Sequence, residues 1–200
     1  RIERGERGCR VGTFPIGIDP ELFAPSDEAE PDDELKNLAR MLDTRRMIVG
    51  VDRLDYTKGI LERLAGFERL LQTHPEQRGR VVLVQIAVPS REDVPDYVEQ
   101  RARIESMVGR INGEYGETDW VPVRYLYRSY APRDIARLFR MADVGLVTPL
   151  RDGMNLVAKE FVAAQDEDRP GVLVLSRFAG AAVELTQAVL TNPLHPDGLA

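Results

Sequence analysis

The sequence is poor in the residues that most often build disulfides and metal clusters. It has a single cysteine, Cys9, and only two histidines, His74 and His195. One cysteine can form neither a disulfide within the chain nor a cysteine metal cluster, which indicates a cytoplasmic protein. The histidines stand alone, so we expect them on the surface, and no Ser/His/Asp or Cys/His arrangement is evident.

Other absences narrow the range of ligands. No apolar run approaches the roughly 18 residues of a membrane span. There is no G-x-x-x-x-G-K-[ST] and no G-x-G-x-x-G, which argues against a P-loop and a nicotinamide dinucleotide site. The formal net charge of −6 argues against a nucleic acid or anionic membrane as partner. Because the chain starts without Met or a signal peptide and stops in a turn-like stretch, we interpret it as a fragment.

Short β-branched runs predict the strands. The 200 residues are 43% hydrophobic and 30% charged, as in ordinary globular proteins, and suffice for one domain with a real core or two small ones. Several runs are apolar throughout, which suits strands buried on both faces of a parallel sheet. The runs are 47–51, 81–86, 121–126, 143–148 and 172–175, with 187–191 as a candidate for a sixth.

Helical patterns alternate with these runs. They follow Gly59 as far as Leu71, follow Pro132 as far as Ala142, and cover 156–165 and the charge-laced, more exposed 98–111. The alternation predicts an α/β fold with a Rossmann-like, doubly wound parallel sheet. Such sheets bind ligands outside the carboxyl ends of their strands. Residues 26–33, rich in Asp, Glu and Pro, predict an acidic loop or linker.

The loop after the first strand carries two cations, Arg53 and Lys58. Arginine offers a planar fork to phosphate oxygens, and lysine offers a mobile point charge. Gly59 lets the backbone come close at the start of the next helix, where free N–H groups favour anions. The alternative is a solvated loop in which Asp52 pairs with Arg53 and Asp55 pairs with Lys58.

Two later strands end near further candidates, Arg91 and Tyr130. Arg91 is either a ligand contact or a surface charge at a helix start, and the second is the commoner case. Tyr130 is either a ring that stacks on a flat base or an ordinary core or rim tyrosine. Small residues in 176–181 allow close approach of the backbone.

The stretch from Thr148 to Glu160 combines a turn, a helix start and two carboxylates. Gly153 permits a tight turn, and Asn155 is a plausible helix cap. The free donors of the new helix are the amides of Asn155, Leu156 and Val157. Asp152 can face a ligand, and Glu160 can accept two hydroxyls, as a ribose presents. The set suits a diphosphate linked to a polyhydroxyl group, and the alternative is coincidental loop polarity.

Five longer motifs carry a resemblance to a known family. They are "FPIGID", "VDRLDYTKGI", "GRINGEYG", "DVGLVTPLRDGMNLVAKEFVAAQ" and "GVLVLSRFAGAA". Together they resemble the trehalose-6-phosphate synthases, retaining glycosyltransferases of the GT-B type with two Rossmann-like domains. The resemblance runs from about Phe14 to Pro193 and includes the acid-x7-acid spacing of Asp152 and Glu160. It implies that residues 1–19 end the interdomain crossover and that 20–200 form the C-terminal, nucleotide-sugar-binding domain.

The resemblance also implies roles for individual residues. The implied catalytic residues are Arg53, Lys58 and Asp152. The implied donor-binding residues are Ile86, Tyr130, Ile135, Gly153, Met154, Asn155, Leu156, Val157 and Glu160. Arg91 would reach the phosphate of the acceptor. No metal is implied, because the two cations would take its place.

The implied activity is transfer of glucose from UDP-glucose to glucose 6-phosphate with retention of configuration. UDP-glucose is a substrate, so we expect no cofactor. Alternatives are a different phosphorylated acceptor, such as glycerol 3-phosphate, and a non-catalytic regulatory module that binds nucleotide sugars. The donor base stays open between uracil, guanine and adenine. A missing N-terminal domain is the expected partner, a homo-oligomer is left open, and the fragment alone should be inactive.

Overall fold

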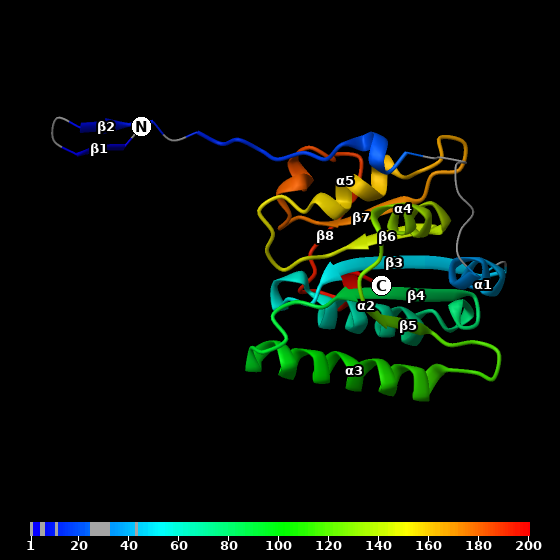
Figure 1. The fold of residues 1–200 in the computed structure, drawn as a ribbon. Coiled ribbons are helices and arrows are strands. Elements are labelled where there is room, and N and C mark those ends of the chain that lie inside the picture. The colour runs from blue at the N-terminus through cyan, green and yellow to red at the C-terminus, as the bar shows by residue number, and fades with distance from the viewer. Residues whose placement is uncertain (1, 5–6, 11, 25–32, 43) are drawn as a thin grey trace.

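The computed structural model describes residues 2–4, 7–10, 12–24, 33–42 and 44–200. Its body is a six-stranded sheet in the order β5-β4-β3-β6-β7-β8, and every neighbouring pair is parallel (Figure 1). The strands are β3 (Arg46–Arg53), β4 (Val81–Val88), β5 (Val123–Tyr127), β6 (Val144–Val147), β7 (Val172–Ser176) and β8 (Val189–Thr191). All six predicted strands, including the sixth, are therefore confirmed.

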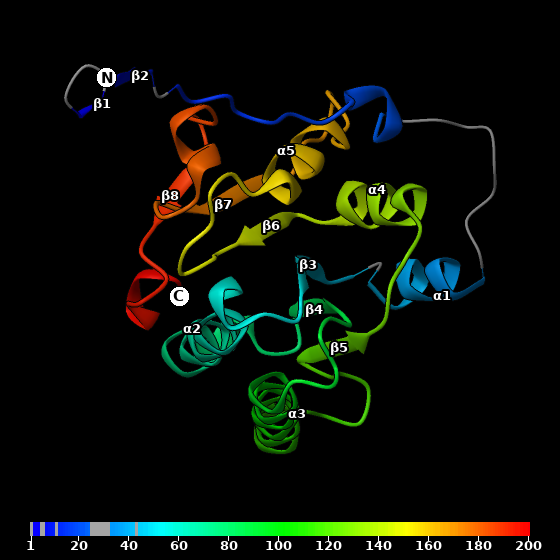
Figure 2. The ribbon, with the colours of Figure 1, turned by 60° about the vertical axis from the view of Figure 1, so that its left-hand side comes forward.

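Helices cover both faces of this sheet. Figures 1 and 2 show α2 (Ile60–Thr73) and α3 (Pro95–Tyr115) together on one face. On the other face lie α4 (Pro132–Met141) and α5 (Leu156–Ala163). β4 is almost entirely buried, as its apolar sequence predicts for a strand covered on both sides. The predicted doubly wound α/β class is confirmed.

Some predicted boundaries were wrong. The third strand begins at Val123 rather than at 121, because Pro122 lacks an N–H and contributes only its carbonyl, which accepts from the amide of Leu83. The prediction from sequence missed α1 (Asp33–Leu42). The predicted acidic loop lies outside the described residues except for Asp33, which begins this helix.

The order of the strands creates a switch point between β3 and β6. From β3 the chain builds outward through β4 to β5, then returns to place β6 on the other side of β3. Neighbouring connections thus leave in opposite directions at the carboxyl ends of β3 and β6. A doubly wound sheet has its natural ligand crevice at this point.

The remaining elements are short. A hairpin of β1 (Ile2–Arg4) and β2 (Arg7–Cys9) lies away from the sheet (Figure 1). Single 3-10 turns follow along the chain. They are η1 (Pro20–Leu22), η2 (Tyr56–Lys58), η3 (Pro75–Gln77), η4 (Gly180–Val183) and η5 (Pro196–Gly198).

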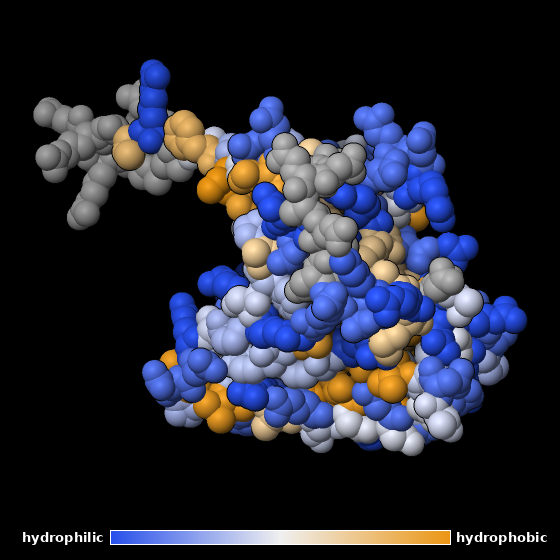
Figure 3. Space-filling model, turned by 45° about the vertical axis from the view of Figure 1, so that its right-hand side comes forward, coloured by the Kyte–Doolittle hydropathy of each residue, from blue (hydrophilic) through white to orange (hydrophobic). Residues whose placement is uncertain are grey.

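The face shown in Figure 3 is mainly hydrophilic, with apolar side chains exposed in separate patches. Phe14 and Ile16, before the body of the fold, are 92% and 63% exposed, and Val183 on η4 is 81% exposed. Among the described residues no helix combines the length and the apolar character needed to cross a membrane.

Candidate functional site in the crevice between β3 and β6

An ion pair joins the two loops of the crevice. Lys58, the last residue of η2, lies 2.5 Å through its Nζ from Oδ2 of Asp152 in the loop after β6. The two side chains are 15% and 16% exposed, so the pair is largely shielded from water but still accessible. The structure therefore brings together two of the residues predicted to act in catalysis, although they are far apart in sequence.

The alternative pairing within the first loop is wrong. Asp52 points into the protein and pairs with Arg63 of α2 instead of Arg53, because successive side chains of a strand point to opposite faces. The carboxylate of Asp55 accepts hydrogen bonds from the amide and hydroxyl of Thr57 rather than from the ammonium of Lys58. Burial opposes ionisation of Asp55, but the bonds from Thr57 and the nearby positive charges outweigh it and lower its pKa.

Backbone contacts fix the same two loops against each other. The amides of Leu150 and Arg151 both donate to the carbonyl of Thr57, at 2.8 and 3.3 Å. Gly59 has a φ of 68°, and a Cβ there would lie 2.4 Å from the carbonyl oxygen of Thr148. Only glycine allows both this φ and this approach. The loop after β3 and the loop after β6 thus form one connected unit.

The start of α5 faces this unit as predicted. Asn155 caps the helix through Oδ1, which accepts from the amide of Ala158 at 3.1 Å, and its Nδ2 donates to Asp152. Its φ of 71° lies in the left-handed region, which asparagine tolerates better than most residues. The amides of Asn155, Leu156 and Val157 donate to no described residue. All three amides of the predicted anion seat therefore lack a partner within the described chain.

The turn before α5 is packed against the loop after β7. The amide of Gly180 donates to the carbonyl of Asp152 at 3.0 Å. A Cβ at Gly180 would lie 2.0 Å from the carbonyl oxygen of Gly153, so this position cannot hold a larger residue without moving the turn. Met154 is partly buried beside the core. The close approach predicted for residues 176–181 is confirmed.

Glu160 lies on the second turn of α5 and is half-buried. No described residue donates a hydrogen bond to its carboxylate, and burial raises its pKa above the usual range. A carboxylate without a partner in partly apolar surroundings is ready to accept hydrogen bonds from a ligand.

The other two predicted cations are more exposed. Arg53 ends β3, and its guanidinium has no hydrogen bond or ion pair with a described residue. Arg91 follows β4, donates from Nη1 to the hydroxyl of Tyr97 at 3.1 Å, and lies 5.6 Å from the centre of that ring. Tyr97 in turn lies 3.4 Å from Oδ2 of Asp55. Arg91 has a φ of 49°, which is uncommon for a residue with a side chain.

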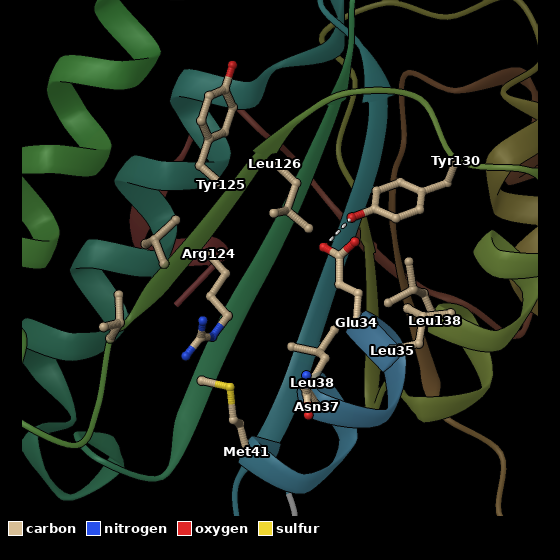
Figure 4. A pocket seen from close by; sticks show the side chains of 12 residues that line it. Glu34, Leu35, Asn37, Leu38, Met41, Arg124, Tyr125, Leu126, Tyr130 and Leu138 are labelled. Atoms are coloured by element: carbon tan, nitrogen blue, oxygen red, sulfur yellow. Dashed lines mark hydrogen bonds between the residues drawn. The ribbon is translucent and has the colours of Figure 1, made fainter. Parts of the chain in front are cut away.

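The predicted base-binding residues lie in the core or pack against it. Ile86 is 0% exposed and Ile135 is 8% exposed, so both are part of the core. Figure 4 shows Tyr130 pointing its hydroxyl at Glu34 of α1, at 3.1 Å, beside a cavity of about 550 Å³. Burial, followed by the charge of Glu34, raises the pKa of Tyr130. The contact of these three residues with a base stays a prediction.

Sequence inspection missed the buried polar residues beneath the crevice, above all Arg63 and Thr148. Arg63 shares the buried face of α2 with Ile60, Leu64 and Phe67. A cation in such a position signals a buried partner, and this signal was present in the sequence. His74 and His195 are exposed, as predicted. Within the described ranges, no group of three or more His, Cys, Asp or Glu side chains is placed to hold a metal ion.

An open parallel sheet with a cation, a carboxylate and a free helix start at its switch point defines a doubly wound α/β protein with a crevice whose groups suit an anion. Comparison with known proteins gives the family. The model of glycosyltransferase family 20 matches residues 1–200, and the chain belongs to this family.

Individual relatives agree with this assignment. The chain is 52% identical to a bifunctional trehalose-6-phosphate synthase/phosphatase of Thermoproteus tenax, over 100% of this chain and 27% of the relative. An alpha,alpha-trehalose-phosphate synthase (UDP-forming) from Burkholderia xenovorans, solved with glucose-6-phosphate, is 49% identical with a TM-score of 0.90, over 94% and 41%. An E. coli structure bound with UDP-2-fluoro glucose is 48% identical with a TM-score of 0.89, over 93% and 41%. The chain thus spans less than half the length of each.

Proposed function

We propose that these residues form the donor-binding half of a retaining glucosyltransferase. The full-length protein would move glucose from UDP-glucose to glucose 6-phosphate and release trehalose 6-phosphate and UDP. The observation that carries the proposal is the ion pair of Lys58 with Asp152 beside the free amides that begin α5. A donor diphosphate needs a cation and free N–H groups, and the attached sugar needs a hydrogen-bond acceptor.

The proposed roles follow the order of groups along the crevice. Lys58 and Arg53 face the diphosphate, together with the amides of Leu156 and Val157. Asp152 accepts from a glucose hydroxyl, and Gly153, Met154 and Asn155 surround the sugar. Glu160 accepts from the ribose hydroxyls, which supplies the partners that its carboxylate lacks in the free protein. Tyr130 and Ile135 flank the base, and Ile86, which has no exposed surface, backs the base pocket from within the core.

The proposed reaction needs no nucleophile from the protein. The bond between the anomeric carbon and the diphosphate oxygen breaks, and its electron pair leaves with UDP. A hydroxyl oxygen of the acceptor bonds to the anomeric carbon on the same face, and its proton passes to the departing diphosphate. Lys58 and Arg53 lower the barrier by stabilising the negative charge that builds on the leaving group.

The acceptor side of the proposal rests mainly on the relatives. The Burkholderia structure holds glucose-6-phosphate, and the E. coli structure holds UDP-2-fluoro glucose. We assign Arg91 to the acceptor phosphate, because its guanidinium is exposed at the carboxyl end of β4. We further propose that residues 1–19 end a crossover from an acceptor-binding domain and that 20–200 form the donor domain, active only together.

The test uses the full-length gene product. UDP release is followed with UDP-glucose and either glucose 6-phosphate or glycerol 3-phosphate, and the product is identified. We expect release with glucose 6-phosphate and trehalose 6-phosphate as the product. Calorimetry with UDP, GDP and ADP identifies the base. Nucleotide binding without release under any acceptor would favour the non-catalytic module and contradict the proposed reaction.

A further inference from the structure

The seam between β3 and β6 opens part of the way along the sheet. The two strands pair only at Ile48 with Val144 and at Val49 with Gly145. Toward the carboxyl end of β3, residues 50–53 pair with β4 alone. This opening lies at the base of the crevice. Polar groups along it cannot bond to a neighbouring strand there, so they need other hydrogen-bond partners.

The guanidinium of Arg63, from α2, occupies this opening and is 0% exposed. Its Nη1 donates to Oδ2 of Asp52 at 2.5 Å and to Oε1 of Gln85 at 2.8 Å. Its Nε donates to Oγ1 of Thr148 at 3.0 Å. Its Nη2 lies 3.5 Å from the carbonyl oxygen of Lys58. One side chain therefore contacts β3, β4, the end of β6 and the turn of Lys58.

The surrounding backbone is shaped for this guanidinium. A Cβ at Gly50 would lie 2.5 Å from Nη1 of Arg63 and 2.7 Å from Oε1 of Gln85. A side chain at position 50 would therefore displace the guanidinium or the amide that receives it. β3 therefore has glycine, with no side chain, at the point where the guanidinium of Arg63 packs against it.

The residues that bond to Arg63 are adjacent in sequence to the candidate groups of the crevice or lie in the same loop. Asp52 immediately precedes Arg53, and Thr148 begins the loop that carries Asp152. The carbonyl that Nη2 approaches belongs to Lys58 itself. Because Arg63 has no exposed surface, it cannot touch a bound ligand. Any effect on the reaction must pass through the loops that it holds.

Stability alone does not explain this arrangement. Burial raises the pKa of Asp52, and the charge of Arg63 only partly opposes that effect. Apolar side chains of similar volume often replace a buried ion pair without loss of stability. What the four partners of Arg63 share is their place: Lys58 and Thr148 lie in the two loops of the crevice, and Asp52 and Gln85 lie in the strands at its base.

We propose that Arg63 is a positioning residue, whose buried guanidinium fixes Lys58 and the loop of Asp152 at the distance that the donor diphosphate and sugar require. This inference rests on the proposed function, since it concerns the groups assigned there to the donor. A displacement of about 1 Å in such groups is enough to cost a large factor in rate.

The main test is Thr148→Val in the full-length protein. Valine keeps the shape of threonine but removes the oxygen that accepts from Nε of Arg63. We expect kcat to fall about tenfold while KM for UDP-glucose changes less than about twofold, because the ligand contacts remain but their geometry loosens. The amides of Leu150 and Arg151, which donate to Thr57, should exchange with solvent about tenfold faster.

The matched control is Thr191→Val. Thr191 is also buried at the end of a strand, at 6% exposure, and its hydroxyl also makes one hydrogen bond, to the carbonyl of Gly198. It contacts neither Arg63 nor the crevice loops. We expect this variant to keep wild-type kcat and wild-type exchange at Leu150. A loss of kcat in Thr148→Val no larger than in the control would overturn the proposal.

Arg63→Lys provides a second test. Lysine keeps the positive charge opposite Asp52 but lacks the planar fork that reaches several acceptors together. We expect a lower kcat in a folded protein, and wild-type kcat would overturn the proposal. If this variant does not fold, Thr148→Val decides. If the wild-type protein releases no UDP, the proposed function fails, whereas amide exchange at Leu150 and Arg151 still decides whether Arg63 orders the loops.

Discussion

The two halves of the carboxyl edge are built in different ways. Between β3 and β6, Lys58 and Asp152 are held by an ion pair, by two backbone bonds to Thr57 and by the buried guanidinium of Arg63. Beside β4 and β5 the candidate groups contact only an aromatic ring or an exposed partner. Arg91 lies against Tyr97, and Tyr130 bonds to Glu34.

This difference indicates a division of labour. A group that must stabilise charge in a transition state works best when it is already in place, because its reorganisation then costs nothing during the reaction. A group that binds a second substrate can tolerate adjustment, since binding itself orders it. We call the part between β3 and β6 the held half and the part beside β4 and β5 the exposed half. We therefore expect substitutions in the held half to lower kcat and substitutions in the exposed half to raise KM.

Lys58→Ala and Arg53→Ala should have the largest effects. Each removes one positive charge beside the departing diphosphate, and we expect kcat for UDP release to fall about 10²- to 10³-fold. Their stabilities should differ. Lys58→Ala leaves Asp152 without its ion-pair partner and should cost about 1 kcal/mol in a thermal melt. Arg53 has no described partner, so its loss should leave the melt unchanged.

A double-mutant cycle isolates the pair itself. Asp152→Asn should cost much less in the Lys58→Ala background than in the wild type, because the two side chains act together. Simple additivity would show that the ion pair does not couple them. Near-normal UDP release in both Lys58→Ala and Arg53→Ala would contradict the assignment of these two residues to the leaving group.

Gly180→Ala should have the next largest effect. The new Cβ would meet the carbonyl oxygen of Gly153 at 2.0 Å, so the turn that carries Asp152 must shift. We expect kcat/KM to fall about 100-fold, with a lower melting temperature. The matched control is Gly109→Ala, where the exposed helix interior of α3 has open space. That variant should gain about 0.5 to 1 kcal/mol of stability.

The sequence predicted the held half better than the exposed half for a physical reason. The apolar strand runs give the sheet, and a parallel sheet brings Lys58 and Asp152 to one edge whatever the loop details. Asn155 is a cap because of its local chemistry. The partners of Asp152 and Asp52 depend on which side chains meet across strands, which no local pattern records. Arg63 is the exception, because its charge on an apolar helix face marks it.

The exposed half depends more strongly on tertiary contacts. Helix α1 was not predicted from the sequence, although Leu35, Leu38 and Leu42 repeat with helical spacing. Without that helix, neither the cavity beside Tyr130 nor its bond to Glu34 can be foreseen. Burial of Ile86 likewise follows from the helices that cover β4.

Arg91→Ala tests the exposed half. Removing one charge-assisted contact to the acceptor phosphate should raise KM for glucose 6-phosphate about tenfold, the lower end for such a bond because the side chain is exposed. Calorimetric affinity for UDP should not change. Arg103→Ala removes an exposed arginine of α3 that pairs with no described residue, so it controls for net charge and should leave both values unchanged. A fall in kcat with constant KM would place Arg91 in the held half.

Glu160→Gln should have the smallest effect and shows most clearly as a pH dependence. Burial raises the pKa of Glu160, so its carboxylate takes up a proton at less acidic pH than an exposed glutamate. The protonated form accepts poorly from ribose hydroxyls. Wild-type affinity for UDP should therefore fall a few-fold as pH is lowered from neutral into the acid range, whereas the Gln variant should bind more weakly at neutral pH and vary less.

The stability of the free protein must show the opposite sign. A raised folded pKa means that ionised Glu160 is unfavourable in the fold, so its relative contribution is best in acid and declines as pH rises through that pKa. Glu160→Gln should thus be at least as stable as the wild type at neutral pH. Glu76→Gln, an exposed residue of η3, is the control. If Glu160→Gln leaves both the affinity and its pH dependence unchanged, Glu160 does not meet the ribose.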